Sequence, residues 1–349
     1  FGLSIQGVLL LAALVGVAVL FLEIPLSHLA DRFNRIRISI AGASAWAGFS
    51  VFTGLAANVP LLGVARAGAG LGRVVNGSTH NSLIADWYPP TVRPAVFGVH
   101  RAANSVGQFV GPLAAGGIAY LLGWRAPFLL FAIPTVIFVA LAARLRDPVR
   151  GGQERMALGG DQQAVETEEE PATLSEAFRT LWAVRTMRRI WMSLPLVAVA
   201  VVGLSPLIQL FYEEAFGLNE LERGLVTALS EPAQIVGYLV GIPIATRLMR
   251  RDPGLLVKFL AVLTALSALS LLFLVAAQNL FLAVASQAVL AAMRSSLGPG
   301  LFALFSLVIP PRVRSLGFSA GNFFIVPALA AAPLVGGFAD DWGLRPAIM

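Results

Sequence analysis

The sequence contains no cysteine, which excludes disulfides, thiolate metal sites and thiol catalysis within these 349 residues. Charge is also scarce, because 13% of the residues are charged while 57% are hydrophobic, and the mean hydropathy is +0.78. Such a chain has too little polar surface for a water-soluble globule. The composition therefore predicts an integral membrane protein, and an all-α one, because helices satisfy their own backbone in lipid.

Catalytic and metal-binding residues are equally sparse. The three histidines, His28, His80 and His100, do not have metal-ligand spacing, and no nucleophile stands beside a base with an orienting group. The sequence has no Gly-x-x-x-x-Gly-Lys-Ser/Thr phosphate loop, so we expect no ATP-driven step. We expect no enzyme, no metal and no cofactor. The net charge of +6 does not indicate nucleic acid, because the cations lie between apolar runs.

Long apolar segments recur along the whole chain. A helix that crosses a bilayer needs roughly 20 apolar residues. Ten segments qualify, at 5–28, 37–57, 60–85, 94–121, 125–145, 186–212, 221–247, 255–276, 280–307 and 313–338. Every second connection holds most of the basic residues, whereas the alternate connections hold only Arg125, Arg223 and Arg345. This asymmetry predicts a multi-pass protein of the plasma (inner) membrane whose basic connections are cytoplasmic.

The chain also repeats itself at a fixed offset of 221 positions. The shift matches, among others, Arg73 with Arg294, Gly77 with Gly298, Pro89-Pro90 with Pro310-Pro311, Arg93 with Arg314, Phe97 with Phe318 and Pro112 with Pro333. Prolines and arginines are too rare in both segments for shared hydrophobicity to explain the match. The repeat predicts two related halves with the same orientation in the membrane. We expect an N-terminal bundle at 1–146, a cytoplasmic linker at 147–185 and a C-terminal bundle at 186–349.

The linker is the one polar stretch of the chain. Residues 151–171 are rich in glycine and glutamate, which predicts disorder. Thr173 and Glu176 then have the spacing of a capping box, and Leu174, Phe178, Leu181 and Trp182 share one helical face. We expect a short amphipathic helix there, either on the inner membrane surface or as a simple spacer.

Several stretches resemble the major facilitator superfamily. The run Ser27-His28-Leu29-Ala30-Asp31-Arg32-Phe33-Asn34-Arg35-Ile36-Arg37 is similar to that family's Gly-x-Leu-Ala-Asp-Arg-x-Gly-Arg-Arg loop, with Ser27 and Asn34 in place of glycines. Arg66-x-x-x-Gly70-x-Gly72 resembles its fourth-helix motif, and Gly107-x-x-x-Gly111-Pro112 resembles the fifth-helix motif of exchangers. The resemblance implies a two-bundle fold of twelve helices. Ten of them would be visible here, with the first and twelfth missing.

Within that family, residues 66–128 look most like Spinster-type lipid transporters, although Arg73 stands where those proteins have a glutamate. The resemblance also implies that Arg66 takes part in proton coupling. It further implies that Asp31, with Arg35 alongside, meets the start of the helix near Val313 and holds an inner gate shut, since a helix N-terminus favours negative charge.

Charges inside the membrane are the main candidates for function, because each costs roughly 2.5–3.5 kcal/mol at a helix centre. Arg73 and Arg294 are repeat counterparts near the midplane, so we expect them to bind an anionic substrate group together. Internal salt bridges, Arg73 with Glu23 or Arg294 with Glu231, are the alternative. Glu231 and Glu23 are also candidates for proton coupling.

Polar and flexible positions complete the expected site. The amides Asn104, Gln108, Gln209, Gln234 and Asn322 face either the substrate cavity or a neighbouring helix. Gly111 and Pro112 are expected to help gating, because proline frees a backbone carbonyl and allows a bend. Glycines at 68, 70 and 72, and at 107, 111, 116 and 117, are expected to let neighbouring helices approach closely.

Together these features predict a secondary transporter that works by alternating access and exports an amphipathic or anionic organic solute in exchange for protons. An uncoupled facilitator of the same fold is the alternative, and a receptor or scaffold that transports nothing is a third possibility. The expected partners are a small-molecule or lipid-like substrate, a proton or other coupling ion, and membrane lipids. We expect a monomer and no nucleic acid.

Overall fold

The structure is a computed structural model that describes residues 21–167 and 170–324. Side chains within these ranges are described except at 71, 73–76, 164, 196–206, 220–221 and 229–231. The chain forms two compact units, which interleave along the sequence. Unit 1 comprises residues 21–87, 108–185 and 308–323, and unit 2 comprises residues 88–107, 186–307 and Phe324.

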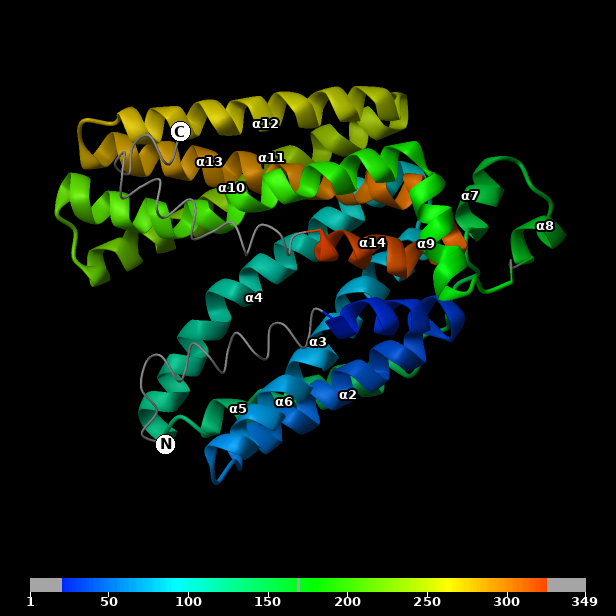
Figure 1. The fold of residues 1–349 in the computed structure, drawn as a ribbon, viewed down its shortest axis with the longest axis horizontal. Coiled ribbons are helices and arrows are strands. Elements are labelled where there is room, and N and C mark those ends of the chain that lie inside the picture. Colours follow the sequence, from blue (N-terminus) through cyan, green and yellow to red (C-terminus); the bar gives the residue numbers. More distant parts are fainter. Residues whose placement is uncertain (1–20, 168–169, 325–349) are drawn as a thin grey trace. The chain divides into compact units, whose positions relative to one another are not determined.

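Unit 1 packs most helices of the first half of the chain with one helix of the second half (Figure 1). It contains a helix at 21–32, α2 (Arg35–Gly54), α3 (Val59–Trp87), α5 (Ala126–Leu130), α6 (Ala132–Ala142), α7 (Gly152–Ala157), α8 (Gln162–Glu166), α9 (Leu174–Ala183) and α14 (Arg314–Phe323). Helix α2 packs against α3, α5 and α6, and α14 packs against α3. The helix α4 (Arg93–Leu122) begins in unit 2 and ends in unit 1.

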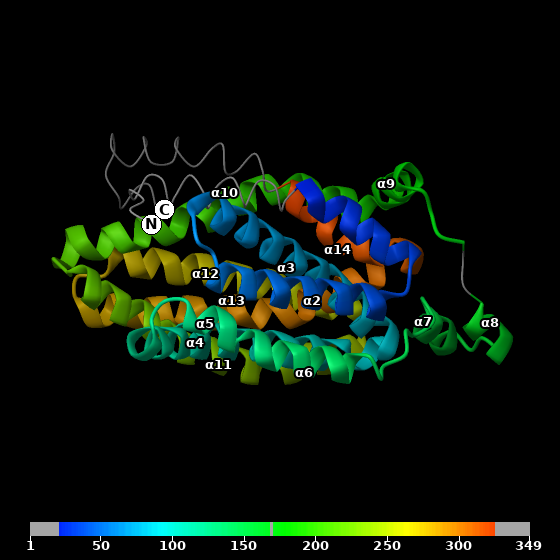
Figure 2. The same ribbon diagram turned by 90° about the horizontal axis from the view of Figure 1, so that it is seen from below.

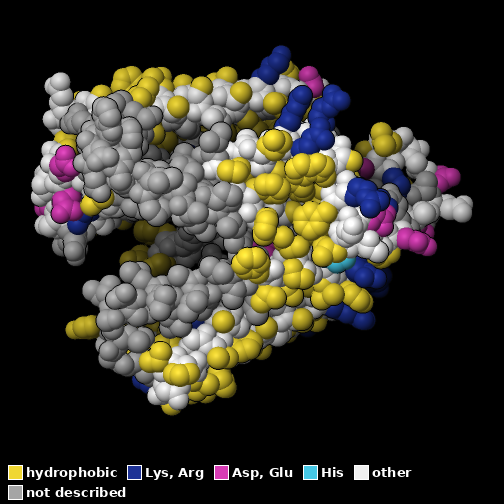
Figure 3. Space-filling model, viewed as in Figure 1, with side chains coloured by type: hydrophobic (Ala, Val, Ile, Leu, Met, Phe, Trp, Pro, Cys, Tyr) yellow, Lys and Arg dark blue, Asp and Glu magenta, His cyan; other side chains and the backbone are white. Residues whose placement is uncertain are grey.

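Unit 2 contains four long helices that run alongside one another in both ribbon views (Figures 1 and 2). They are α10 (Arg185–Phe216), α11 (Glu220–Arg251), α12 (Pro253–Ala276) and α13 (Leu280–Val308). A buried aromatic and aliphatic cluster around Phe211, Tyr212 and Leu274 joins the ends of α10, α12 and α13. In both units hydrophobic side chains also cover much of the drawn face (Figure 3), as expected for helices that contact lipid.

The predicted helices are present where the structure describes them, except that the segment 125–145 is divided into two. Among the described residues, four helices are long and apolar enough to cross a membrane: Pro90–Leu122, Glu222–Arg251, Pro253–Ala276 and Leu280–Val308. The predicted segments 5–28 and 313–338 lie partly outside the described residues. The count of ten spans, and the bundle boundaries at 146 and 185, therefore stay predictions.

One predicted helix is not continuous. The segment 125–145 forms two helices, α5 and α6, which are separated by a turn at Phe131. Pro134 follows shortly after the turn and has no N–H to donate to the carbonyl of Leu130. The missing hydrogen bond explains why the helix breaks there.

The sequence repeat is confirmed at the level of helix bounds. Helices α3 and α13 both have 29 residues, and their ends differ by the same 221 positions as the repeat. Each is followed by a Pro-Pro turn and a short 3-10 helix, η1 (Pro90–Val92) or η2 (Pro311–Val313). The next helices then begin at the equivalent arginines, Arg93 and Arg314.

The predicted disorder of the linker is wrong for its first part. Helices α7 and α8 form within it and pack against each other, and Gly151 and Gly152 are buried. The expected helix after it is confirmed as α9, which begins where the Thr173 hydroxyl accepts a hydrogen bond from the Glu176 N–H. Its buried side chains, Ala177 and Leu181, face the protein, and Leu181 lies beside Gly317 of α14.

Glycines bring α2 and α3 into close contact. A Cβ at Gly72 would lie 2.7 Å from the backbone nitrogen of Trp46 and would also collide with the Gly42 carbonyl. By contrast, Cβ atoms at Gly107, Gly111, Gly116 and Gly117 would meet no described atom within 4 Å. The expected close approach is therefore confirmed at Gly72, but the structure shows no such contact at these four glycines of α4.

We predict that Gly72→Ala will destabilise unit 1 by about 1–3 kcal/mol, because backbone atoms of α2 cannot move aside as a flexible side chain would. Gly77→Ala is the matched control on the same helix, since a Cβ there meets nothing within 4 Å. Thermal unfolding of the purified variants in detergent should show a lower Tm for Gly72→Ala only. Equal Tm values for the two variants would contradict the close contact.

Candidate functional site

The predicted contact of Asp31 is present in unit 1. Its carboxylate accepts hydrogen bonds from the backbone N–H groups of Ser315 (2.8 Å) and Leu316 (2.9 Å), in the first turn of α14. Those N–H groups have no acceptor within the helix, and the helix dipole favours negative charge at this end. Asp31, in the last turn of the helix at 21–32, thus joins the first half of the chain to a helix of the second half.

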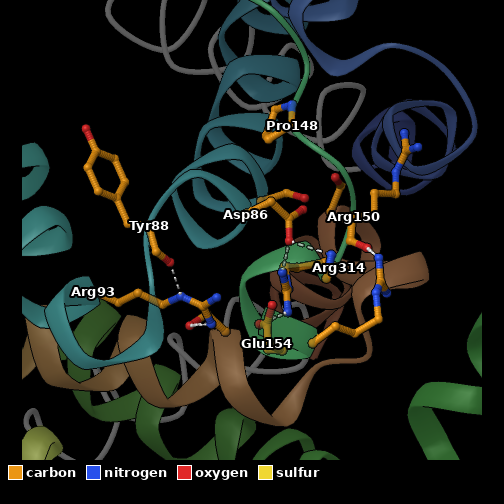
Figure 4. A network of polar contacts seen from close by, with 12 residues as sticks. Asp86, Tyr88, Arg93, Pro148, Arg150, Glu154 and Arg314 are labelled. Atoms are coloured by element: carbon orange, nitrogen blue, oxygen red, sulfur yellow. Dashed lines mark hydrogen bonds and ion pairs between the residues drawn. The ribbon is translucent and has the colours of Figure 1, made fainter. Parts of the chain in front are cut away.

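A buried carboxylate at the end of α3 lies next to this contact. Asp86 forms ion pairs with Arg35, at the start of α2, and with Arg314, at the start of α14. Figure 4 shows the pair of Asp86 with Arg314. All three side chains are essentially inaccessible to solvent. Arg35 was expected beside Asp31 but instead donates to Asp86, to the Ser82 hydroxyl and to Asp147. Burial acts to lower the pKa of Arg35, but the carboxylates of Asp86 and Asp147 outweigh it and raise that pKa.

The linker completes this network. Asp147 accepts from the Arg35 backbone N–H (2.6 Å) and from its Nε (2.9 Å). The Gly151 N–H donates to Asp86 at 3.0 Å, and Glu154 pairs with Arg314 at 2.5 Å (Figure 4). We call the side chains of Asp31, Arg35, Asp86, Asp147, Glu154 and Arg314 the gate network. It draws on both halves of the chain and on the linker.

Unit 2 contains the repeat counterpart of the Arg314 contact. The side chain of Arg93, at the start of α4, donates to the Tyr88 carbonyl (3.0 Å, Figure 4) and to the Ser306 hydroxyl of α13 (3.1 Å). Arg93, from the first half of the chain, thus contacts the end of α13, and its equivalent Arg314, from the second half, contacts the end of α3. The position equivalent to Asp86 is Leu307, so this second contact has no carboxylate at that point.

The predicted substrate pair is described only in part. Arg294 lies on α13 with an exposed side chain, although the surrounding helix is strongly apolar. Arg73 lies on α3, but its side chain is outside the described residues. The pairing of the two arginines therefore stays a prediction. Asn104 and Gln108, both on α4, are exposed, as a cavity-lining amide would be.

Three other predicted amides contact neighbouring helices. The Gln209 side chain donates to the Thr227 hydroxyl (2.6 Å), which links α10 to α11. The backbone carbonyl of Gln234 accepts from the Ser295 hydroxyl at 2.9 Å. Asn322 of α14 donates to the carboxylate of Glu23 at 2.7 Å. The structure therefore brings together Asn322, which was predicted to bind substrate, and Glu23, which was predicted to take part in proton coupling.

The remaining predicted residues are placed as follows. The guanidinium of Arg66 is exposed and lies 5.7 Å from the ring centroid of Phe128. Glu231 lies on α11 with its side chain outside the described residues. Helix α4 continues through Pro112, and Gly111 beside it is partly exposed. The gating role of these two positions stays a prediction.

Sequence reasoning missed several charged residues of the site. Asp86, Asp147, Glu154 and Arg314 belong to the gate network, yet only Arg314 had a signal in the sequence, which was its match with Arg93 in the repeat. It also missed Arg101, whose guanidinium lies 3.9 Å from the Phe302 ring centroid within unit 2. An arginine inside a predicted span is a signal that could have found it.

The helices and this site define a multi-pass, all-helical membrane protein with two related halves and an interlocking polar network. Residues 1–333 match the family model of the Major Facilitator Superfamily, and the chain belongs to that family, whose members are transporters rather than enzymes. The crystal structure of FucP in the outward conformation has the same fold, with a TM-score of 0.74 and 15% identity over 100% of this chain and 87% of that one.

Two curated relatives add to this family assignment. The cis,cis-muconate transport protein of Acinetobacter baylyi is 25% identical over 63% of this chain and 52% of its own length. The lincomycin resistance protein of Streptomyces lincolnensis is 40% identical over 34% of this chain and 24% of its own length. The chain thus spans about half of the first relative's length and less of the second's. The Spinster-like subtype is not confirmed.

We predict that Asp86→Asn will destabilise the protein by about 3–5 kcal/mol, because it leaves two buried guanidinium groups without their shared carboxylate. Asp252→Asn is the matched control, since Asp252 is exposed and asparagine is an equally good N-cap for α12. Thermal and denaturant unfolding in detergent should separate the two variants. A change below 1 kcal/mol for Asp86→Asn would show that Asp86 does not hold the network together.

The pH dependence of the protein's stability should reflect the protonation of the Asp31 carboxylate. Burial raises the pKa of Asp31 from its ordinary 3.8 to about 6, although the N–H groups of Leu316 and Ser315 act to lower it. The folded state therefore binds a proton more tightly than the unfolded chain does. The resulting contribution to stability is complete below pH 3.8 and is lost as the pH rises through about 6.

We therefore predict that, relative to Asp31→Asn, the wild type gains stability as the pH falls from 7 towards 4, by at most about 3 kcal/mol. Unfolding curves of both proteins at matched pH values measure this difference, because other titrating groups are common to both. A constant difference across this range would exclude the shifted titration.

Proposed function

We propose that this protein is a secondary transporter that works by alternating access and exports an anionic or amphipathic organic solute in exchange for protons. The single observation that carries the proposal is the contact of Asp31 with the first turn of α14. It links the two halves of the chain through hydrogen bonds that can break and reform. Family membership makes such a link meaningful, because transporters of this family must separate their halves at one membrane face in turn.

The gate is proposed to lie on the cytoplasmic side. The connections that contain Asp31, Asp86 and Arg314 belong to the set of every second connection, which together hold most of the chain's basic residues. In unit 1, the Lys and Arg side chains of the drawn face gather at the end where α7 and α9 lie (Figure 3). With the gate network intact, the cytoplasmic face is closed and substrate enters from the opposite side. Cytoplasmic opening then requires α14 to leave both Asp31 and Asp86.

Proton coupling is proposed to act through Glu23. Its carboxylate accepts a hydrogen bond from Asn322, which lies on the same helix as the partners of Asp31. Protonation replaces a charged acceptor by a neutral group and weakens this hydrogen bond. A proton on Glu23 would therefore favour release of α14. Arg66 and Glu231 remain further candidates for the proton pathway.

The substrate class is proposed from Arg294 and from one relative. An exposed guanidinium on an apolar helix suits an organic anion, because it offers planar, paired donors to a carboxylate. The muconate transport protein is named for such an anion, a dicarboxylate. The name of the lincomycin resistance protein supports export as the direction of transport.

We predict that Arg294→Ala will reduce transport of cis,cis-muconate at least tenfold, since a charge-assisted hydrogen bond contributes roughly 1.5–3 kcal/mol. Arg294→Lys should retain part of the activity, because it keeps the charge but loses the planar fork. Arg250→Ala, an exposed cytoplasmic arginine on α11, is the matched control. Transport is measured in proteoliposomes with an imposed pH gradient and an internal pH dye.

Each outcome of this assay distinguishes among the proposals. Muconate transport that is unchanged in Arg294→Ala would contradict the role of this arginine. Transport of lincomycin but not of muconate would contradict the proposal that the substrate is an anion, and would leave the proposal of export standing. Substrate movement without a proton flux would make the protein an uncoupled facilitator. No movement of either compound by the wild type, in either direction, would count against a transport function for these substrates.

A further inference from the structure

We infer that residues 147–154 of the linker form a wedge that holds the cytoplasmic gate closed and must leave α14 before the gate opens. This inference rests on the gate proposed above. It adds that the linker is a working part of the gate rather than a tether between the two bundles.

The wedge is fixed to the first half of the chain by several contacts. Asp147 binds the side chain and the backbone of Arg35, and the Arg35 Nη2 donates to the Pro148 carbonyl at 2.7 Å. Arg150 donates to the carbonyls of Phe33 (2.8 Å) and Ala30 (3.3 Å), next to Asp31. These contacts hold the segment against the end of the helix at 21–32, which carries Asp31.

The wedge also contacts the second half of the chain. Glu154 pairs with Arg314 at 2.5 Å, while the Gly151 N–H donates to the same Asp86 oxygen that accepts from Arg314. Gly151 has a φ of +69°, and a Cβ there would lie 2.7 Å from the Pro311 side chain. The segment is therefore seated on the turn that leads into α14, and a glycine makes the close approach possible.

This geometry couples the wedge to the gate. Gly151 and Glu154 are three residues apart, and one bonds Asp86 of α3 while the other bonds Arg314 of α14. When α14 moves away from α3, these two contacts cannot both persist. Asp147 follows the end of α6 at Ala142 by five residues, so the segment is expected to stay with the first half. The contacts of Glu154 and Gly151 with α14 and its turn are then the ones that break.

A buried thiol on α14 can report gate opening. The sequence has no cysteine, so Ser319→Cys introduces a single reactive site. Ser319 is buried one helical turn after Ser315, on the same face of α14. A water-soluble maleimide applied to the cytoplasmic side of membrane vesicles will label this thiol only when α14 leaves its contacts.

Two pairs of variants in the Ser319→Cys background test the wedge. Glu154→Gln removes the charge that pairs with Arg314, and Glu170→Gln makes the same change at an exposed linker position. Gly151→Ala adds a Cβ against Pro311, and Gly159→Ala adds one at a φ of +81° where nothing lies within 4 Å. The second control therefore carries the same backbone strain without the collision.

We predict that Glu154→Gln and Gly151→Ala will each speed labelling about tenfold, which corresponds to about 1.4 kcal/mol. Their controls should stay within about twofold of the parent. Asp31→Ala should also speed labelling, which shows that the thiol reports the gate. Size-exclusion profiles and Tm values confirm that each variant is folded.

The wedge and the gate fail in distinguishable ways. If Asp31→Ala speeds labelling while Glu154→Gln and Gly151→Ala match their controls, the wedge is excluded and the gate stands. If Asp31→Ala also leaves labelling unchanged, the proposed gate falls, and the wedge falls with it. If the controls speed labelling as much as the test variants, any disturbance of the linker opens the gate, and the specific contacts are excluded.

Discussion

The carboxylate of Asp86 is the constraint on which the rest of unit 1 depends. Removing a charge from water is costly, and a buried charge is tolerated only when its partners surround it with good geometry. Asp86 has three such partners: Arg35 from the start of α2, Arg314 from the start of α14 and the backbone N–H of Gly151 from the linker. Segments far apart in the sequence must therefore arrive at the end of α3 together. The network specifies their arrangement more than it adds stability.

The internal repeat explains where this network sits and why it is asymmetric. Both halves present a long helix, a Pro-Pro turn and an arginine at the start of the next helix. Arg314 meets the carboxylate of Asp86, whereas its counterpart Arg93 meets the hydroxyl of Ser306. An ion pair depends strongly on neighbouring charges, and a hydrogen bond from a charged donor to a neutral hydroxyl does so less. The same scaffold thus carries one ion pair, at Arg314, and one hydrogen bond to a neutral acceptor, at Arg93.

Much of the fold could be predicted from the sequence because hydrophobic runs and prolines are local signals. The bounds of α3 and α13 follow from them, and the break between α5 and α6 could have been read from Pro134. The contact of Asp31 with α14 followed from a motif and the helix dipole. The linker contacts could not be predicted, because glycines and scattered charges in a polar segment are also the composition of a disordered chain. Only the folded structure shows that the linker residues have specific partners: Asp147 pairs with Arg35, Glu154 pairs with Arg314, and the Gly151 N–H donates to Asp86.

The proposed gate consists of polar contacts, which suits a transporter that must open and close. Apolar side chains have nearly the same free energy against another helix as against lipid, so an apolar contact alone would hold a gate closed only weakly. An ion pair in the bilayer core could hardly open, because its separated charges would face hydrocarbon. At the cytoplasmic edge of the membrane, where we propose that the gate lies, water can take over the hydrogen bonds of Asp31, Asp86 and Arg314 as they separate. The free energies of the closed and open arrangements can then be similar, although each bond is strong in its own surroundings. Small changes, such as one proton or the seating of a short segment of linker, are enough to choose between two such arrangements.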